Sequence, residues 1–288
     1  MTSLMRKTGV ALEMIKWEHS IFALPFALTA SVLAAQGWPH ASVMFLIILC
    51  MVSARTAAMA FNRLADADLD AVNPRTASRA LPAGTLGKGF VTGFVAISAL
   101  IFLFAAAMLN RLTLELAPIA LGIVLAYSYM KRITRWSHLV LGFALGIAPS
   151  AAWIAVRGTF DPRIVVLTLA VLLWVGGFDV LYACQDFEHD RRVGLNSVPQ
   201  AFGIEAAFWI ARVMHLLMIA MLLWLIRLFE LGLISLAGVV VVVALLAYEH
   251  SIISPKDLRR MNAAFFTLNG VISVVFFCFV AADVIGRS

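Results

Sequence analysis

Residues 163–190 read RIVVLTLAVLLWVGGFDVLYACQDFEHD, an apolar run that ends in a cluster of acidic residues. The apolar part, 163–182, matches the roughly 20 mostly apolar residues that a helix needs to cross a bilayer. Asp179 falls inside this run. A carboxylate at membrane depth is costly and is by default a sign of function. This stretch therefore indicates a membrane-spanning helix whose end carries chemistry.

The whole chain shares this apolar composition. Of its 288 residues, 62% are hydrophobic and 13% are charged, and its mean hydropathy is +0.96. Charged residues alone make up about 25% of a typical soluble domain, so the class of soluble globular proteins is excluded. Comparable apolar windows recur along the chain. We predict an all-α membrane protein with nine transmembrane helices, near 19–36, 40–60, 89–109, 112–130, 138–155, 163–182, 206–228, 230–250 and 264–285.

Most connections between these windows are short, and no composition shift marks a second domain, so we expect a single transmembrane domain over 1–288. Two connections are longer, 62–88 and 183–205. Each opens with acidic residues and then turns basic. This shared plan suggests an internal repeat of helix end and loop.

The basic residues follow the predicted topology. The net charge is +6, and with a cytoplasmic N-terminus most of the 22 Lys and Arg residues fall on the cytoplasmic side. The positive-inside rule therefore predicts a multi-pass protein of the cytoplasmic (inner) membrane, with its C-terminus outside and its acidic segments facing the cytoplasm. Because topology explains the basic charge, we expect no nucleic-acid partner. The five Lys and Arg residues on the other side are Arg111, Arg157, Arg163, Arg227 and Arg287.

The first acidic segment places Asn62, Asp66 and Asp70 at every fourth residue. On a helix these three share one face. Like charges four residues apart destabilise a helix unless something neutralises them. Carboxylate and amide oxygens are the ligands that a hard divalent cation selects. The spacing therefore predicts a bound cation.

The second acidic segment repeats this arrangement with Asp179, Asp186 and Asp190, whose spacings of seven and four again fall on one helical face. One such cluster alone is equally well explained as a solvated helix end. Two clusters at cytoplasmic helix ends, each followed by basic residues, favour a site.

Those basic residues suit an anion. Arg75 and Arg79 follow the first segment and precede a turn at 81–84 that can fold the loop back over the helix ends. Lys131 and Arg132 reach the same membrane face from another loop. Arg forms two-point contacts with phosphate, and magnesium keeps substrate phosphates among its ligands. We predict a magnesium-bound diphosphate at the mouth of an apolar bundle, which suits a prenyl diphosphate.

Four stretches resemble the UbiA superfamily of intramembrane aromatic prenyltransferases, and the resemblance extends over nearly the whole chain. They are Asn62-x3-Asp66-x3-Asp70, Arg75-Thr-x2-Arg79-x-Leu-Pro-x-Gly84, Tyr127-x3-Lys131-Arg132 and Asp179-x2-Tyr182-Ala-x2-Asp186-x3-Asp190. The resemblance implies a UbiA-type fold, nine helices around a central cavity that opens toward lipid, and Mg²⁺-dependent transfer from a polyprenyl diphosphate to an aromatic carboxylic acid.

The resemblance also assigns residues to roles. Arg55 would contact the acceptor, and Lys16, before the first predicted helix, would lie near the phosphates. Four carboxylates would be catalytic: Asp66, Asp70, Asp186 and Asp190. The metal set would be Asn62, Asp66, Asp70, Asp179, Asp186 and Asp190. The diphosphate set would be Lys16, Arg75, Arg79, Tyr127, Lys131 and Arg132.

One residue departs from the pattern of the ubiquinone-pathway enzymes: Arg63 stands where they typically have Asp. The expected acceptor is 4-hydroxybenzoate, and the alternative is 1,4-dihydroxy-6-naphthoate of the futalosine menaquinone route. A membrane transporter of a charged metabolite is a candidate from another class. It would be expected to carry its charges at mid-membrane depth beside broken helices, whereas here they cluster at one face.

The remaining polar residues are interpreted structurally. Asn262 and Asn269 are expected to hydrogen-bond between helices. His189 is expected to be an exposed neighbour of the second acidic segment. Five histidines lack ligand spacing, which gives no support to a haem or zinc role: His19, His138, His189, His215 and His250.

Overall fold

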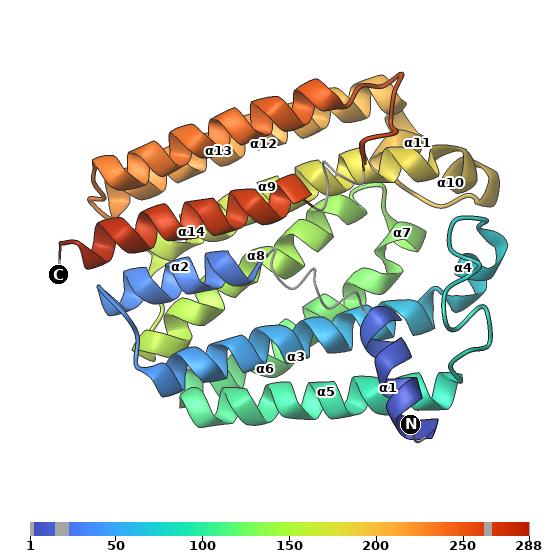
Figure 1. The fold of residues 1–288 in the computed structure, drawn as a ribbon, viewed down its shortest axis with the longest axis horizontal. Helices are drawn as coiled ribbons and strands as arrows, with labels where there is room; N and C mark the ends of the chain where they lie inside the picture. Colours follow the sequence, from blue (N-terminus) through green and yellow to red (C-terminus); the bar gives the residue numbers. More distant parts are fainter. Residues whose placement is uncertain (1–2, 15–22, 262–266, 288) are drawn as a thin grey trace.

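The structure, a computed structural model, describes residues 3–14, 23–261 and 267–287, and within these ranges it is helical apart from loops and one isolated bridge between Ser254 and Asp257 (Figure 1). Three 3₁₀ turns occupy Tyr127–Tyr129, Pro162–Ile164 and Cys184–Asp186. The α-helices are α1 (Ser3–Met14), α2 (Leu24–Ala35), α3 (Ala41–Ala65), α4 (Ala67–Val72), α5 (Lys88–Leu109), α6 (Arg111–Ala126), α7 (Met130–Ile133), α8 (Ser137–Arg157), α9 (Val165–Ala183), α10 (Phe187–Val193), α11 (Val198–Phe202), α12 (Ile204–Leu228), α13 (Leu233–Ile252) and α14 (Asn269–Ile285).

Seven helical segments in the described ranges are long and apolar enough to cross a membrane, and the chain is a multi-pass membrane protein. They match seven of the nine predicted windows. The first and last windows correspond to the shorter apolar helices α2 and α14, and parts of both windows, 19–22 and 264–266, lie outside the described residues. The count of nine spans stays a prediction.

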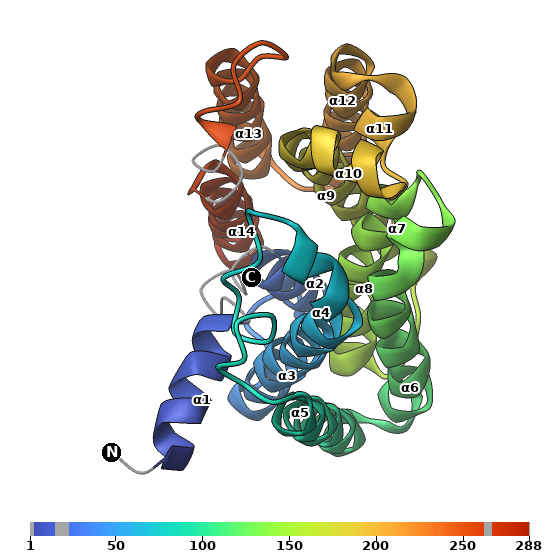
Figure 2. The ribbon, with the colours of Figure 1, turned by 90° about the vertical axis from the view of Figure 1, so that its right-hand side faces the viewer.

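The long helices lie side by side, and the short helices α4, α7, α10 and α11 gather at one end of the bundle (Figure 1). Viewed from that end, α3, α5, α6 and α8 follow one another, and α9, α12, α13 and α14 continue the arrangement (Figure 2). The helix α2 packs against α8 and α14 inside this arrangement. The end with the short helices is where both acidic segments lie.

A close helix contact joins α8 to α9 through two glycines one turn apart. A Cβ on Gly142 would lie 2.3 Å from the carbonyl oxygen of Leu172, and one on Gly146 would lie 2.8 Å from that of Thr168. Small residues at this spacing let membrane helices approach until their backbones touch. A side chain at either glycine would therefore separate α8 from α9.

The core around α9 combines aromatic packing with a polar contact. Trp174 is fully buried, and its ring centroid lies 5.0 Å from those of Phe26 and of Phe178. The Trp174 indole N–H donates to Asn269 Oδ1 at 2.8 Å. The expected interhelical role of Asn269 is thus confirmed, while Asn262 lies outside the described residues.

Each acidic segment bends at its second polar residue. The backbone angles of Asp66 are φ −98° and ψ 6°, and those of Asp186 are φ −97° and ψ 6°. Both residues stand between a long helix and a short one, so the expectation of one continuous helical face per segment is wrong at these points. The two segments thus have the same backbone conformation at corresponding positions, which agrees with the suggested internal repeat.

Candidate active site

A polar cavity of about 170 Å³ lies where the two acidic segments meet. Its walls come from the end of α3, from α4 and the loop after it, and from the 3₁₀ turn Tyr127–Tyr129 with α7. The end of α9, the 3₁₀ turn Cys184–Asp186, α10 and the segment beyond it complete them. The cavity is lined by Asn62, Arg63, Asp66, Leu69, Asp70, Asn73, Arg75, Thr76, Arg79, Tyr127, Ser128, Lys131, Asp179, Tyr182, Ala183, Asp186, His189, Asp190 and Leu195.

Most of the residues predicted from the sequence converge on this cavity. All six of the metal set line it, as do Arg75, Arg79, Tyr127 and Lys131 from the diphosphate set. Residues separated by more than 100 positions thus share one small space.

Three predicted site residues are not among the lining residues. Arg132 reaches the edge of the site, where its Nη2 donates to the Ala65 carbonyl at 2.5 Å and lies 3.2 Å from Asp66 Oδ1. Arg55 is half-buried on α3, and its Nε is buried without a hydrogen-bond partner among the described residues. Lys16 lies outside the described residues.

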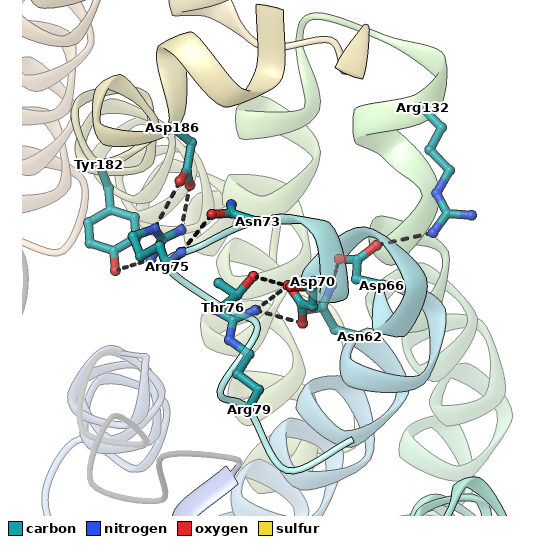
Figure 3. A network of polar contacts seen from close by, with 10 residues as sticks. All are labelled: Asn62, Asp66, Asp70, Asn73, Arg75, Thr76, Arg79, Arg132, Tyr182 and Asp186. Carbon is teal, nitrogen blue, oxygen red and sulfur yellow. Dashed lines mark hydrogen bonds and ion pairs between the residues drawn. The ribbon is translucent and has the colours of Figure 1, made fainter. Parts of the chain in front are cut away.

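The first ion pair of the site joins the two acidic segments (Figure 3). Arg75 donates to both carboxylate oxygens of Asp186, from Nε at 2.9 Å and from Nη2 at 2.5 Å, and its Nη1 lies 3.3 Å from the Tyr182 hydroxyl. Burial lowers the pKa of Arg75, but the hydrogen bonds to Asp186 and the charge of Asp186 together raise it by more. The net shift of the Arg75 pKa is therefore upward. Arg75 is therefore held as a cation against Asp186.

The second ion pair closes the loop onto its own segment (Figure 3). Arg79 Nη1 lies 2.7 and 2.8 Å from the two oxygens of Asp70. The Thr76 hydroxyl donates to the Asp70 carbonyl at 3.1 Å, and Asn73 Oδ1 accepts from the Arg75 backbone N–H at 2.9 Å. The prediction that this loop folds back over the helix ends is confirmed.

Asp66 is less fully neutralised than Asp70. Its Oδ2 accepts from Asn62 Nδ2 at 3.1 Å, and its contact with Arg132 is longer than the Arg79 contacts with Asp70 (Figure 3). Burial raises the pKa of the Asp66 carboxyl, and the hydrogen bond from Arg132 opposes that rise without cancelling it. A second cation beside Asp66 would lower the free energy of its charged form.

Asp179 and Asp190 differ in their hydrogen-bond partners. His138 is fully buried, and its Nδ1 lies 2.6 Å from Asp179 Oδ2. The Asp190 side chain is buried, and its Oδ2 has no hydrogen-bond partner in the described part of the chain.

Sequence reasoning missed several residues in or beside the cavity. His138 contacts the lining residue Asp179 without lining the cavity itself, and the lack of ligand spacing gave it no role, although it begins a helical face that continues through Gly142 and Gly146 at spacings of four. His189 is half-buried and lines the cavity, so the expectation of an exposed neighbour is wrong. Ser128 places a buried hydroxyl without a partner in the described structure on the same wall, and no sequence signal marks it.

The donor set fits magnesium that also binds phosphate. Among the described residues, no three His, Cys, Asp or Glu side chains lie close enough to hold a metal ion by themselves. Magnesium in substrate sites usually takes one or two carboxylates and completes its shell with phosphate oxygens and water. The unpartnered oxygen of Asp190 and the incompletely neutralised Asp66 are suitable donors.

Comparison with known proteins agrees with this fold. The model of the UbiA prenyltransferase family matches residues 23–271. A protein of Vibrio cholerae serotype O1 named 4-hydroxybenzoate octaprenyltransferase is 33% identical over 256 residues, 88% of each chain. The apo structure of a UbiA homolog from Aeropyrum pernix K1 is 30% identical, with a TM-score of 0.84 over 92% of this chain and 98% of that one.

More distant structures share the fold. A UbiA homolog from Archaeoglobus fulgidus, solved with DMAPP and Mg²⁺, gives a TM-score of 0.74 at 17% identity, over 96% of this chain and 99% of that one. The fold and the charged cavity at one end of an apolar bundle define a membrane-embedded transferase. The chain belongs to the UbiA prenyltransferase family and is a prenyltransferase.

Proposed function

We propose that this enzyme transfers a polyprenyl group from a polyprenyl diphosphate to an aromatic acid, 4-hydroxybenzoate, in quinone biosynthesis. One observation carries the proposal: two acidic segments, with Arg75, Arg79 and Lys131, surround one cavity at the end of an apolar bundle. Such a cavity suits a charged head whose hydrocarbon tail extends among the helices. The name of the Vibrio cholerae relative and the DMAPP and Mg²⁺ bound to the Archaeoglobus fulgidus protein support it.

The proposed site residues divide into two groups by chemistry. Mg²⁺, when bound, would supply Lewis-acid stabilisation of the charge on the leaving diphosphate. The cations that would contact the phosphate oxygens are Lys16, Arg75, Arg79, Lys131 and Arg132, with the Tyr127 hydroxyl beside them. The oxygens that would hold Mg²⁺ are those of Asn62, Asp66, Asp70, Asp179, Asp186 and Asp190.

The observed ion pairs indicate how the chain prepares for this ligand. Arg75 and Arg79 are aligned by Asp186 and Asp70 before any phosphate arrives. With Asp186 and Asp70 engaged as metal ligands, Arg75 and Arg79 would be free to donate to phosphate oxygens from positions close to those they already hold. Groups arranged in advance stabilise charge that develops in the transition state without a large reorganisation cost.

Prenyl transfer itself needs little further from the protein. The allylic C–O bond breaks as electrons move onto diphosphate, a ring carbon of the acceptor forms the new C–C bond, and the ring loses a proton. Asp70, Asp190 and the released diphosphate are the candidate acceptors for that proton. Arg55, whose Nε has no partner in the described structure, would pair with the acceptor carboxylate.

The location of the site suits the predicted topology. We propose nine spans in the cytoplasmic membrane, with the N-terminus in the cytoplasm and the cavity open to that side. The basic residues of the long loops near the cavity support this orientation, because the positive-inside rule places them on the cytoplasmic side. A transporter is disfavoured because the charged cavity lies at one end of the bundle and not halfway along it.

The test offers two acceptors together. Purified protein in lipid nanodiscs, with Mg²⁺ and a polyprenyl diphosphate, receives equal amounts of 4-hydroxybenzoate and 1,4-dihydroxy-6-naphthoate, and mass spectrometry identifies the product. Prenylated hydroxybenzoate is the expected result. Prenylated naphthoate alone would overturn the acceptor and assign the menaquinone route. Absence of product from both acids, with no magnesium-dependent release of diphosphate, would overturn the proposed reaction.

A further inference from the structure

We propose that His138 is a positioning residue for this reaction, one that fixes the orientation of Asp179 toward the bound metal and diphosphate. His138 stands at the start of α8 and Asp179 near the end of α9, and they meet at 2.6 Å between Nδ1 and Oδ2. The proposal rests on the proposed function, because it assigns a purpose to Asp179 in that site.

The hydrogen-bond partners of His138 define its tautomer. The backbone N–H of Val198 points at His138 Nε2 at 3.2 Å. An amide N–H can only donate, so Nε2 must carry the lone pair. The ring proton of the neutral imidazole is then on Nδ1 and is donated to Asp179. This order of donor and acceptor is typical of an outer partner that orients a metal-binding side chain.

The bond also decides which oxygen of Asp179 is available. Asp179 lines the cavity, and its Oδ2 is engaged by His138. Oδ1 is therefore the oxygen left for a ligand. Because His138 is fully buried, water does not compete with the imidazole for Oδ2.

The contact depends on the close approach of α8 and α9. His138, Gly142 and Gly146 are spaced by four and so share one face of α8. The two glycines let the backbone of α8 touch that of α9, with a notional Cβ of Gly142 only 2.3 Å from the Leu172 carbonyl oxygen. The imidazole one turn earlier is thereby brought within hydrogen-bond distance of Asp179.

The segment that holds His138 also contacts other cavity residues. The Leu195 N–H donates to the Asp190 carbonyl at 2.9 Å, and the Asn196 N–H donates to the Lys131 carbonyl at 2.8 Å. Val198, two residues after Asn196, is linked to Asp179 through His138. The segment 195–198 therefore contacts Lys131 and Asp190 through their backbones and Asp179 through the imidazole.

A simpler alternative is that His138 only anchors α11 through Val198. Two substitutions separate these roles, because the amide of Asn occupies the place of Nδ1 and the amide of Gln occupies that of Nε2. His138→Asn keeps a donor for Asp179 and loses the acceptor for Val198. His138→Gln keeps the acceptor for Val198 and loses the donor. His138→Leu removes both.

The measurement is calorimetric binding of inorganic diphosphate with Mg²⁺ to detergent-purified protein, followed by kcat with the full substrates. His138→Leu and His138→Gln should each weaken binding by about 10- to 100-fold, the range found for outer partners of metal ligands, and His138→Asn should bind within a few-fold of the wild type. The reverse order, with Gln near wild type and Asn weak, would overturn the proposal in favour of anchoring. Equal binding by all three variants would also overturn it.

Asp179→Asn provides the second arm. In that background, His138→Leu should cause no further loss, because both changes remove the same contribution. Additive losses would show that His138 acts independently of Asp179. The melting temperatures of His138→Asn and His138→Gln, whose side chains are both polar and of similar size, should be equal. Equal values show that a difference in binding between the two variants does not come from a folding defect. If the wild-type protein does not bind diphosphate with Mg²⁺, the proposed function is wrong. If the wild type binds it and the His138 variants bind it equally well, only the role proposed for His138 is wrong.

Discussion

Arg75 and Asp186 lie 111 residues apart in the chain and form a two-point ion pair across the cavity. The pair joins the loop after the first acidic segment to the second acidic segment. Arg79 and Asp70 form a similar pair within the first segment. Each of these arginines thus contacts a carboxylate that the proposed metal site would also use.

Substituting Arg75 with Lys tests the two-point contact. Lys keeps the charge but cannot form paired, coplanar hydrogen bonds. A hydrogen bond to a charged group contributes about 1.5–3 kcal/mol, so the KM for polyprenyl diphosphate should rise by about 10- to 150-fold. Steady-state kinetics at saturating acceptor measures this. Arg157→Lys, at an exposed position at the end of α8, is the control, and an unchanged KM in Arg75→Lys would refute the assignment.

Removing one carboxylate charge from either segment tests the metal set. Asp66→Asn and Asp186→Asn keep the side-chain shape, and each should lower kcat by on the order of 10²-fold, as expected when preorganised charge stabilisation is lost. Asp68→Asn is a matched control in the same segment, because the Asp68 side chain is 95% exposed. Expression and melting temperature should be unaffected in all three. Full turnover in either cavity variant would mean that the metal assignment is wrong.

Patterns within one helix account for what could be predicted from the sequence. Seven of the apolar windows match described helices, and the six residues chosen by their spacings of four and seven all line the cavity, although the helix is interrupted at Asp66 and Asp186. These predictions succeed because residues close in sequence on or beside a helix stay close together in space.

Contacts between helices could not be predicted in this way. His138 and Asp179 are 41 residues apart, and nothing in either local sequence specifies the other as its partner. The spacing of Gly142 and Gly146 indicates a close helix contact but not which helix makes it. The bends at Asp66 and Asp186 were also missed, because the spacing of four from Asp66 to Asp70 and from Asp186 to Asp190 is compatible with an uninterrupted helix.

Substituting Arg55 tests the acceptor site. Arg55→Met keeps much of the apolar stem and removes the charge. The KM for the aromatic acid should rise by about 10- to 150-fold, from loss of a charged hydrogen bond, while the KM for polyprenyl diphosphate should stay the same. An acceptor analogue without the carboxylate, such as phenol, should be used equally by the variant and the wild type. A shift in the diphosphate KM alone would place Arg55 at the other substrate.

Adding a methyl group at Gly142 tests the contact between α8 and α9. Gly142→Ala puts a Cβ against the Leu172 carbonyl and should destabilise the protein by about 1–3 kcal/mol, the usual range for overpacking. Gly122→Ala is the matched control, because a Cβ there meets nothing within 4 Å. Thermal unfolding in detergent measures both. A Gly142→Ala variant as stable as Gly122→Ala would show that the helices can separate without cost.

Removing divalent ions tests whether the ion pairs Arg75–Asp186 and Arg79–Asp70 stabilise the fold without a metal. Since Arg75 and Arg79 already neutralise Asp186 and Asp70, folding should not depend on metal as it does in small zinc domains. Treatment with EDTA should abolish prenyl transfer and leave the melting temperature of the ligand-free protein within about a degree of its original value. A large drop in melting temperature would indicate a structural metal.

The walls of the cavity come from two halves of the chain with opposite character. The first half, up to the end of α8, contributes Arg63, Arg75, Arg79 and Lys131 along with two aspartates, whereas the described lining residues after α8 include three aspartates and no Lys or Arg. Charges left unpaired in a partly buried cavity are costly. The two halves therefore supply counter-ions to each other, and the charge of the cavity is balanced only when both are docked.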